Sequence, residues 1–206
     1  MGINGKAVIE LMKDKGYKDI RAVNLVGVEG IADDGIPNSD QIDLWNDTIL
    51  VVRDSGEVLL ESNGTTEPGA YYVQYPMNTK GCAFMSFGQH RDAWEFGYHN
   101  WNPNHPALVQ TGEIKVIRDN SGRGSRANGT PDVGLFGVNI HGTMGNHRAN
   151  SIGQWSAGCI VTRSWVRHTK MLQLMKDSGR DRITFTLLDG TELAKFCQAT
   201  KRPLAL

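Results

Sequence analysis

Residues 48–62, with the sequence TILVVRDSGEVLLES, hold two short apolar runs on either side of a polar turn. The turn is Asp54-Ser55-Gly56, and its glycine allows the tight backbone that a connection between two strands needs. Valine, isoleucine and leucine in runs of this length favour strands when turn residues bound them. The stretch therefore predicts a β-hairpin, and its pattern sets the expectation for the rest of the chain.

Short segments of the same kind continue after this hairpin, separated by clusters of Gly, Pro or Asn. They are residues 69–75, 81–88, 93–100, 112–119, 134–142 and 182–190. The 24 glycines of the 206-residue chain also favour many short strands over a helical bundle. This succession predicts a mainly β fold, either a sandwich or a barrel of antiparallel or mixed strands.

Helical periodicity is found near the two ends of the chain. Residues 5–16 have the pattern of a short amphipathic helix, and we expect the C-terminal helices within residues 164–200. Ser164 is the expected cap of the first of these, and Gly179 its expected stop. We therefore predict that a β-rich centre is accompanied by peripheral helices.

The chain shows no sign of division into several parts. Neither an internal repeat nor an interdomain linker occurs, so we expect one domain over residues 1–206. Residues 119–132, DNSGRGSRANGTPD, are glycine-rich, polar and long for a loop inside a compact domain. Loops of this kind are usually functional lids or disordered.

The charge balance and the hydropathy pattern exclude several classes of partner. Lysine plus arginine and aspartate plus glutamate number 22 each, so no basic field exists that would attract nucleic acid or an anionic membrane. No segment approaches the roughly 20 apolar residues of a membrane span, and the charged N-terminal segment lacks a secretory signal. We therefore expect synthesis in the cytoplasm and, for any action outside the cell, release by a route other than a signal peptide.

The cysteines and histidines do not form a recognisable metal motif. The three cysteines have unrelated spacings without a CxxC pair: Cys82, Cys159 and Cys197. Five histidines lie within 58 residues, without an HExxH motif: His90, His99, His105, His141 and His147. Scattered surface histidines are the commoner explanation, so we predict no metal and no cofactor. Cys82 is expected to be a core thiol of a strand, and Cys197 one of a helix.

One pair of residues has the composition of a nucleophilic centre. His141 stands near the end of an expected strand, and Cys159 follows the turn Ser156-Ala157-Gly158, eighteen positions after the histidine. An imidazole can take the proton of a thiol and return it to a leaving group when the two are adjacent in space. The alternative is a buried core thiol and an unrelated, hydrogen-bonded loop histidine, and spacing alone favours this alternative.

The residues around the pair favour the nucleophilic interpretation. Residues 140–143 (IHGT) are followed by residues 151–153 (SIG) and then by residues 156–160 (SAGCI). Together with residues 65–73, TTEPGAYYV, this order resembles the L,D-transpeptidase (YkuD-type) family over roughly residues 47–162. The resemblance implies a divergent member with a β-sandwich of short mixed or antiparallel strands and peripheral helices.

The resemblance also implies a role for each matching residue. Cys159 would be the nucleophile and His141 its general base, oriented by the backbone carbonyl of Gly142. The amides of Gly158 and Cys159 would form the oxyanion hole, and Ser156 would brace the turn. Under these roles we expect the pKa of Cys159 to fall below the free-thiol value of about 8.5.

The chain departs from the family pattern at two positions. Ala157 stands where the family has histidine, and Val161 stands where it has arginine or asparagine. Neither change removes the nucleophile or its base. Arg163 lies two positions beyond Val161, on the same face of an extended segment, and could substitute for the missing polar residue. An ordinary surface position explains Arg163 equally well.

Several further side chains are candidates for contact with a substrate. Aromatic candidates for lining a groove are Trp94, Tyr98, His99 and Trp155. The alternative for each is a core position, which is the commoner place for an aromatic residue in a strand. Arginines that flank the pair and could bind a carboxylate are Arg123, Arg126 and Arg148. Solvated loop positions explain these arginines equally well.

The resemblance implies a peptidoglycan stem peptide as the partner and acyl transfer as the reaction. Cys159 would attack the carbonyl of an L,D-bond at a diaminopimelyl residue and release the terminal D-alanine. An amine would then resolve the thioester, as in transpeptidation, or water would do so. Two alternatives are a phage-type lytic L,D-carboxypeptidase or endopeptidase and a non-catalytic cell-wall-binding module that kept the fold.

Overall fold

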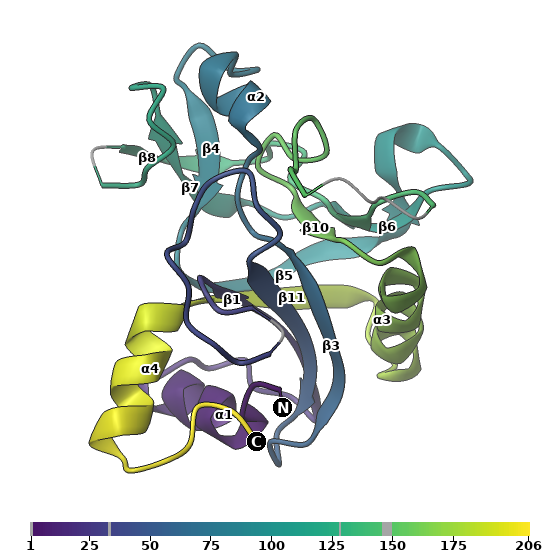
Figure 1. Ribbon diagram of the computed structural model, residues 1–206. Helices are drawn as coiled ribbons and strands as arrows, with labels where there is room; N and C mark the ends of the chain where they lie inside the picture. Colours follow the sequence, from purple (N-terminus) through teal and green to yellow (C-terminus); the bar gives the residue numbers. More distant parts are fainter. Residues whose placement is uncertain (1, 33, 128, 146–149) are drawn as a thin grey trace.

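Eight strands form a closed barrel in the computed structural model, which describes residues 2–32, 34–127, 129–145 and 150–206 (Figure 1). Around the barrel the order is β1-β11-β5-β6-β9-β10-β3-β2. The bounds are β1 Val23–Glu29, β2 Asp47–Arg53, β3 Val58–Thr65, β5 Gly88–Tyr98, β6 Pro106–Gln110, β9 Ile140–Gly142, β10 Ile160–Thr162 and β11 Arg182–Asp189. The mainly β prediction is confirmed, but these strands close on themselves, where the sequence resemblance implied a sandwich.

The barrel closes through its two shortest strands. β9 pairs in parallel with β10, and β10 pairs antiparallel with β3 through Val161 and Thr65. On its other side β9 meets β6 through Ile140 and Leu108. Each barrel strand thus has two neighbours, so this sheet has no open edge of the kind that a sandwich keeps.

The predicted hairpin of residues 48–62 is confirmed as β2 and β3. Val51 lies opposite Leu60, and the Arg53 amide donates to the Glu57 carbonyl across the turn. Gly56 has φ +87°, and a Cβ there would lie 2.6 Å from the Cα of Lys6. The turn therefore requires glycine both for its backbone conformation and for the close approach of the N-terminal helix.

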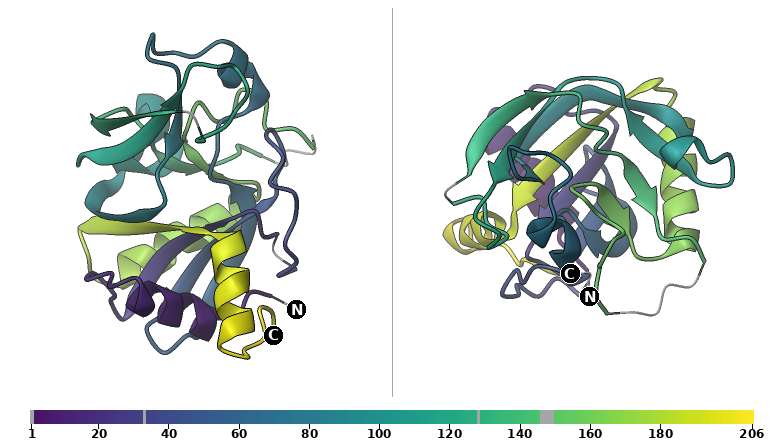
Figure 2. Two further views of the ribbon diagram at one scale, coloured as in Figure 1. Left: turned by 90° about the vertical axis from the view of Figure 1, so that its left-hand side faces the viewer. Right: turned by 90° about the horizontal axis from the view of Figure 1, so that it is seen from above.

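A small antiparallel sheet of order β4-β7-β8 lies beyond one end of the barrel (Figures 1 and 2). Its strands are β4 Cys82–Met85, β7 Ile114–Asp119 and β8 Thr130–Gly134. The expected strand of residues 134–142 is wrong as one element, because the chain leaves β8 at Gly134 and turns at Gly137, φ +73°, before β9. Two strands of different sheets share this segment.

Residues 69–75, expected as a strand, contain instead the short helix α2 Ala70–Gln74. Tyrosine and valine favour strands locally. However, the Asp43 carboxylate accepts the Ala70 amide at 3.0 Å, and it satisfies one of the free amides at the start of the helix. A contact with a distant segment therefore overrides the local preference.

The three long helices are α1 Gly5–Asp14, α3 Trp165–Asp177 and α4 Gly190–Ala199, and a 3-10 turn η1 covers His99–Trp101. The predicted cap of α3 is confirmed, because the Ser164 hydroxyl accepts the Arg167 amide at 3.3 Å. Gly179 follows the helix with φ +72°, as a C-terminal stop requires. None of the described helices combines the length and the apolar character needed to cross a membrane.

The helices cover different parts of the barrel. α1 and α4 pack together at the end opposite the small sheet (Figure 2). α3 packs beside β9 and β10, and its Met171 and Met175 are buried in the same core cluster as Trp94. The helix thus packs against the two three-residue strands that carry His141 and follow Cys159.

The glycine-rich loop between β7 and β8 is tied to the rest of the molecule in its described part. The Asp119 carboxylate accepts the amides of Ser121 and Gly124, each at 2.8 Å. Arg126 donates from both Nη atoms to Glu29 on β1, at 2.5 and 2.6 Å. Arg126, a predicted candidate for binding a substrate carboxylate, therefore binds a carboxylate of the protein itself.

Arg126 connects the loop to a buried cluster of acidic side chains. Glu67 lies 3.3 Å from Nη1 of Arg126, a weaker contact than the two that Glu29 receives. Burial, together with the charge of Glu29, raises the pKa of Glu67 to about 9. Burial raises the pKa of Glu29 as well, to about 8. Because both Nη atoms of Arg126 donate to Glu29 and only one lies near Glu67, at a longer distance, we infer that Glu29 is the carboxyl that ionises and that Glu67 keeps its proton at neutral pH.

The protonated Glu67 should make the fold less stable as the pH rises. A carboxyl with a raised pKa binds its proton more tightly in the folded chain, so its contribution is complete below about pH 4.5 and is lost as the pH rises through about 9. From about pH 6.5 to about 8.5, between histidine and cysteine titration, we expect the free energy of unfolding to fall by up to about 1.4 kcal/mol per pH unit. Glu67→Gln should flatten this slope in denaturant titrations, and an unchanged slope would contradict the assignment.

Candidate active site

His141 and Cys159 come together because they lie on neighbouring parallel strands. His141 is the central residue of β9, and Cys159 directly precedes β10, in which Val161 lies opposite His141. His99 joins them from the end of β5. One ring nitrogen of each histidine and the Sγ of Cys159 all lie within 4.8 Å of one another. Strand pairing thus removes the eighteen-residue separation seen in the sequence.

The environment of His141 leaves one ring nitrogen ready to accept a proton. Its side chain is buried, and Nδ1 lies 3.3 Å from the carbonyl oxygen of Gly142. A carbonyl can only accept, so Nδ1 carries the hydrogen and the lone pair is on Nε2. Nε2 is buried and has no hydrogen-bond partner among the described residues.

Gly142 has two roles in this arrangement. Its carbonyl also accepts Nε2–H of His105 at 2.8 Å, so two imidazoles are held by one oxygen. The residue must lack a side chain, because a Cβ would lie 2.7 Å from the Cβ of His168 in α3. Sequence reasoning considered His105 only as a metal ligand and did not consider His168, since neither contact has a local signal.

The thiol of Cys159 is protonated in the resting site. Its Sγ donates to the Gly137 carbonyl at 3.7 Å, and the side chain is 9 % exposed. Burial raises the pKa of Cys159 to about 11, against the opposing effect of a backbone contact with Asn139. The expected pKa below the free-thiol value is therefore wrong for this state.

The base is neutral as well. Burial, and then the neighbouring ring of His99, hold the pKa of His141 well below its ordinary value. The resting pair is a neutral thiol and a neutral imidazole, not an ion pair. Proton transfer must then accompany attack on a substrate, a sequence that catalytic pairs can follow when substrate completes their geometry.

The turn before Cys159 is fixed by Ser156. The Ser156 hydroxyl donates to the Cys159 carbonyl at 2.7 Å and accepts the Gly158 amide at 3.1 Å. The Gly158 amide is therefore engaged and is a poor candidate for an oxyanion hole, contrary to the expectation. Gly158 itself has φ +124°, and a Cβ there would lie 2.6 Å from the Ala83 carbonyl oxygen. The Cys159 amide is the remaining candidate of the two that the resemblance implied.

His99 is held in a defined orientation and tautomer. Its ring stacks on His141 with centroids 3.9 Å apart and planes 21° apart. Asn139 accepts the Gln110 amide through Oδ1 at 3.0 Å, so its Nδ2 donates to Nδ1 of His99 at 3.1 Å. The hydrogen of the His99 ring is therefore on Nε2. Burial lowers the pKa of His99 to about 4, so the ring is neutral at physiological pH.

This tautomer bears on metal binding. His99, His141 and Cys159 have the composition of a zinc ligand set, and their potential ligand atoms are close. A ligating His99 would need a free ring lone pair, but the lone pair on Nδ1 accepts the Asn139 amide. The hydrogen bonds therefore fit a metal at this place poorly. Of the other histidines, His90 donates from Nε2 to the Ser86 carbonyl at 2.9 Å, and His147 lies outside the described residues.

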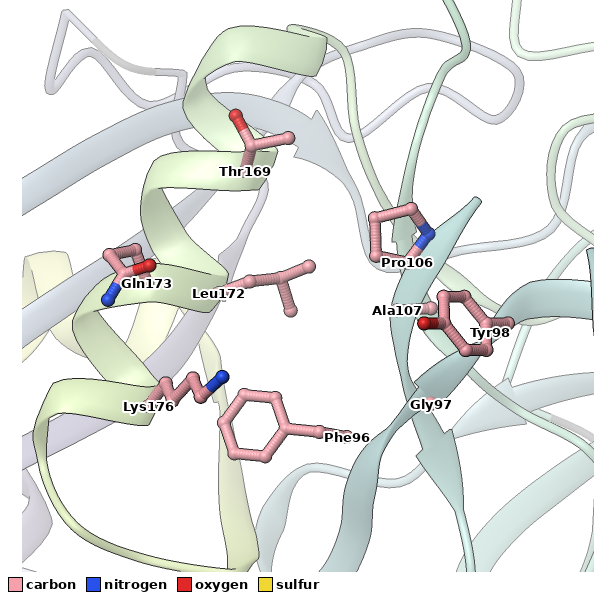
Figure 3. Close-up of a pocket in the computed structure, with 9 residues that line it drawn as sticks. All are labelled: Phe96, Gly97, Tyr98, Pro106, Ala107, Thr169, Leu172, Gln173 and Lys176. Atoms are coloured by element: carbon pink, nitrogen blue, oxygen red, sulfur yellow. The ribbon is translucent and has the colours of Figure 1, made fainter. Parts of the chain in front are cut away.

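A cavity of about 550 Å³ contains the thiol of Cys159. His99, Trp155 and Ala157 line it, so two of the four aromatic candidates are at the site. Tyr98 is not among the described residues that line this cavity. It lines a separate apolar groove between β5, β6 and α3, where Figure 3 shows it near Pro106 and across from Leu172.

The remaining candidates lie elsewhere. Trp94 is fully buried in the core, and its Nε1 donates to the Val138 carbonyl at 2.7 Å. Arg163 donates to Asn150 at 3.3 Å and is not among the described residues of the cavity. Of the two other candidate arginines, Arg123 is exposed on its loop and Arg148 lies outside the described residues. Of the two other cysteines, Cys82 is buried on β4 and lines the cavity, and Cys197 is buried in α4.

Comparison of the chain with protein-family models, curated proteins and solved structures finds no match. The function of the chain is therefore inferred from the geometry of this site and from the sequence motifs that form it.

The neutral resting pair gives a distinct pH dependence of thiol reactivity. In a Cys82→Ala/Cys197→Ala chain, iodoacetamide should alkylate Cys159 slowly at neutral pH. Below its pKa of about 11, the rate should rise about tenfold per pH unit with the thiolate fraction. Mass spectrometry of samples taken over time measures the rate. A plateau reached below about pH 8.5 would show a preformed thiolate–imidazolium pair instead.

Proposed function

We propose that this protein is a cysteine acyl-transfer enzyme in which Cys159 is the nucleophile and His141 the general base. The observation that carries the proposal is that His141, whose buried Nε2 has no partner among the described residues, has a ring nitrogen within 4.8 Å of the Cys159 thiol, and that this thiol lines a cavity. A buried polar atom without a hydrogen bond is costly. Asn63 Oδ1 and His168 Nδ1 are the other two among the described residues, and His141 is the one of the three residues that lies beside a cysteine thiol. A substrate-linked proton transfer gives this nitrogen its partner.

The geometry supports a stepwise acyl transfer. As Sγ of Cys159 attacks a carbonyl carbon, its proton passes to Nε2 of His141. The Gly142 carbonyl, which already accepts Nδ1–H, stabilises the imidazolium that forms. The Cys159 amide is available to the developing oxyanion. The imidazolium then protonates the leaving amine, and the thioester is released by water or by a second amine.

The proposed substrate class is a peptidoglycan stem peptide, with cleavage at an L,D-bond. Its support is that the separate motifs of the resemblance meet at one place. Thr65 pairs with Val161, and the Gly69 amide donates to the Ser156 carbonyl at 2.9 Å, so residues 65–73 lie beside the cysteine turn. Of the two residues that differ from the family pattern, Val161 is buried and cannot contact a substrate, whereas Ala157 lines the cavity.

A lytic hydrolase that uses the same thioester is the second candidate. Trp155 lines the cavity and packs against the cluster that contains Cys159. A bulky side chain beside the nucleophile restricts the approach of a second peptide more than that of water. This placement favours hydrolysis as a strong competitor of cross-linking.

Substitutions at the pair should separate an enzyme from a binding module. Cys159→Ala should abolish turnover of muropeptides and covalent labelling by a thiol-reactive acylating agent. His141→Ala should lower turnover by about 10² to 10⁴, the range of general acid–base catalysis. Cys197→Ala is the matched control, because this thiol is buried in α4 away from the cavity. Full activity in Cys159→Ala would refute the mechanism.

The products should show how the thioester is resolved. We incubate the protein with tetrapeptide muropeptides, with and without an added D-amino acid, and weigh the products by mass spectrometry. Tripeptide is the expected main product in both mixtures, since Trp155 disfavours a second peptide. Dimers or exchanged tetrapeptides as main products would instead establish a transpeptidase.

A further inference from the structure

One cationic side chain, Arg118 of β7, lines the cavity that contains Cys159. Among the described residues that line it, Arg118 is the only lysine or arginine, and none is aspartate or glutamate. His99 is neutral at physiological pH, as argued above. The charge of the cavity wall is therefore set by one guanidinium group, and it favours an anionic ligand.

The strand register places Arg118 close to the cysteine turn. Arg118 lies opposite Ala83 in the antiparallel pair of β7 and β4. Ala83 in turn touches the turn, because a Cβ on Gly158 would lie 3.2 Å from the Cβ of Ala83. Directly opposite residues share a face of the sheet, with Cβ atoms about 5 Å apart. The Cβ of Arg118 is therefore one strand spacing away from the Cβ of Ala83, the residue that touches the turn before Cys159.

The guanidinium group is fixed in its position. The side chain is 6 % exposed, and its Nε donates to Asp132 at 3.1 Å. The group lies over the ring of Phe136, 4.5 Å from the centroid. Nη1 donates to the Gly81 carbonyl at 3.4 Å. A guanidinium has five N–H donors in a planar fork, so these contacts leave donors for a ligand.

The cavity side of Arg118 keeps an excess of positive charge. Asp132 also accepts Lys80 Nζ at 3.0 Å, so one carboxylate is shared by two cations. The neighbouring Asp119 carboxylate accepts the amides of Ser121 and Gly124 and is not among the described residues that line the cavity. Lys80 is largely exposed and is not among the described residues of the cavity, whereas Arg118 is buried beside it. The excess positive charge therefore persists on the cavity side, where low solvent exposure strengthens its interaction with an anion.

We propose that Arg118 binds a carboxylate of the acyl donor, about one residue from the scissile carbonyl, and that it thereby selects anionic peptides. The proposal rests on the proposed function in that it takes this cavity as the place of the acyl donor. An arginine whose guanidinium group is held in place in this way can bind a carboxylate through two parallel hydrogen bonds. Arg118 is thus a specificity residue, with no part in proton transfer.

The charge preference can be measured at Cys159 without any peptide. In the Cys82→Ala/Cys197→Ala chain, the alkylation rate with iodoacetate is divided by the rate with iodoacetamide at the same pH. The thiolate fraction cancels in this ratio, so a changed pKa does not affect it. We expect the ratio to exceed that of free cysteine and to decrease with added NaCl. Arg118→Met should lower it about tenfold, as the loss of a charge-assisted contact does.

Two variants control for structural effects. Lys115→Met removes an exposed cation of the same strand that is not among the described residues of the cavity, and it should leave the ratio nearly unchanged. Arg118→Lys keeps a cation and should restore part of the preference. If Arg118→Met does not fold, the ratio measured in the Cys82→Ala/Cys197→Ala chain, and the dependence of that ratio on salt, still test the proposal. A ratio equal to that of free cysteine, or one unaffected by folded Arg118→Met, would overturn the proposal.

A second arm tests the peptide itself. Cys159→Ala is titrated with a diaminopimelate-containing tetrapeptide and with the same peptide carrying a carboxamide in place of the side-chain carboxylate. We expect about tenfold weaker binding of the amidated peptide, and equal binding of the two by the chain that also carries Arg118→Gln. Equal binding of the two peptides by Cys159→Ala would count against the proposal. Failure to bind either peptide, with the iodoacetate preference intact, would refute the substrate class in the proposed function and leave the anion site standing.

Discussion

The parallel pairing of β9 with β10 is the constraint on which both the fold and the site depend. It closes the barrel between β6 and β3, and it sets Val161 opposite His141. A slip of one residue would turn His141 to the other face of the sheet and away from Cys159. The backbone hydrogen bonds that complete the barrel therefore also set the distance between thiol and imidazole.

Charge is distributed unevenly over the molecule. The buried ion pair of Arg126 and Glu29 holds a loop against the barrel, and neither residue is among the described residues of the thiol cavity. Around Cys159 the thiol and the rings of His99 and His141 are neutral at rest, because burial opposes charge on each of them, and Arg118 is the one charged side chain among the described residues that line the cavity. The neutral thiol and imidazole avoid the cost of a standing ion pair between them. Charge on this pair then develops only when a substrate supplies the groups that stabilise it.

The sequence predicted those features whose causes are local. The hairpin at Asp54-Ser55-Gly56 and the cap at Ser164 depend on residues a few positions apart, and both are found. The helix at residues 70–74 depends on Asp43, a distant residue, and was missed for that reason. The closure of the barrel was missed too, because three-residue strands carry no periodic signal.

The site was predictable to a similar degree. The motifs around His141 and Cys159 indicated that the two residues form a pair. Only the fold shows that the two residues lie close together. The orientation of His99 by Asn139 could not be foreseen, since it depends on a hydrogen bond between residues 40 positions apart in the sequence. The raised pKa of Cys159 depends on burial, which a motif does not specify. The engagement of the Gly158 amide by Ser156 also changes a role that the motif alone suggested.

Because β9 and β10 are short, few backbone hydrogen bonds join them to the rest of the barrel. Most of its strands are joined by long ladders, whereas β9 meets β6 at Leu108 and Ile140, and β10 meets β3 at Val161 and Thr162. Regions joined by few backbone hydrogen bonds open at lower free energy than the rest of a domain. β9 and β10 together are thus the part of the barrel that can move from its neighbours at the least cost in free energy. The pairing of β9 with β10 lies within this moving part, so the spacing of thiol and imidazole is kept even where the barrel is weakest.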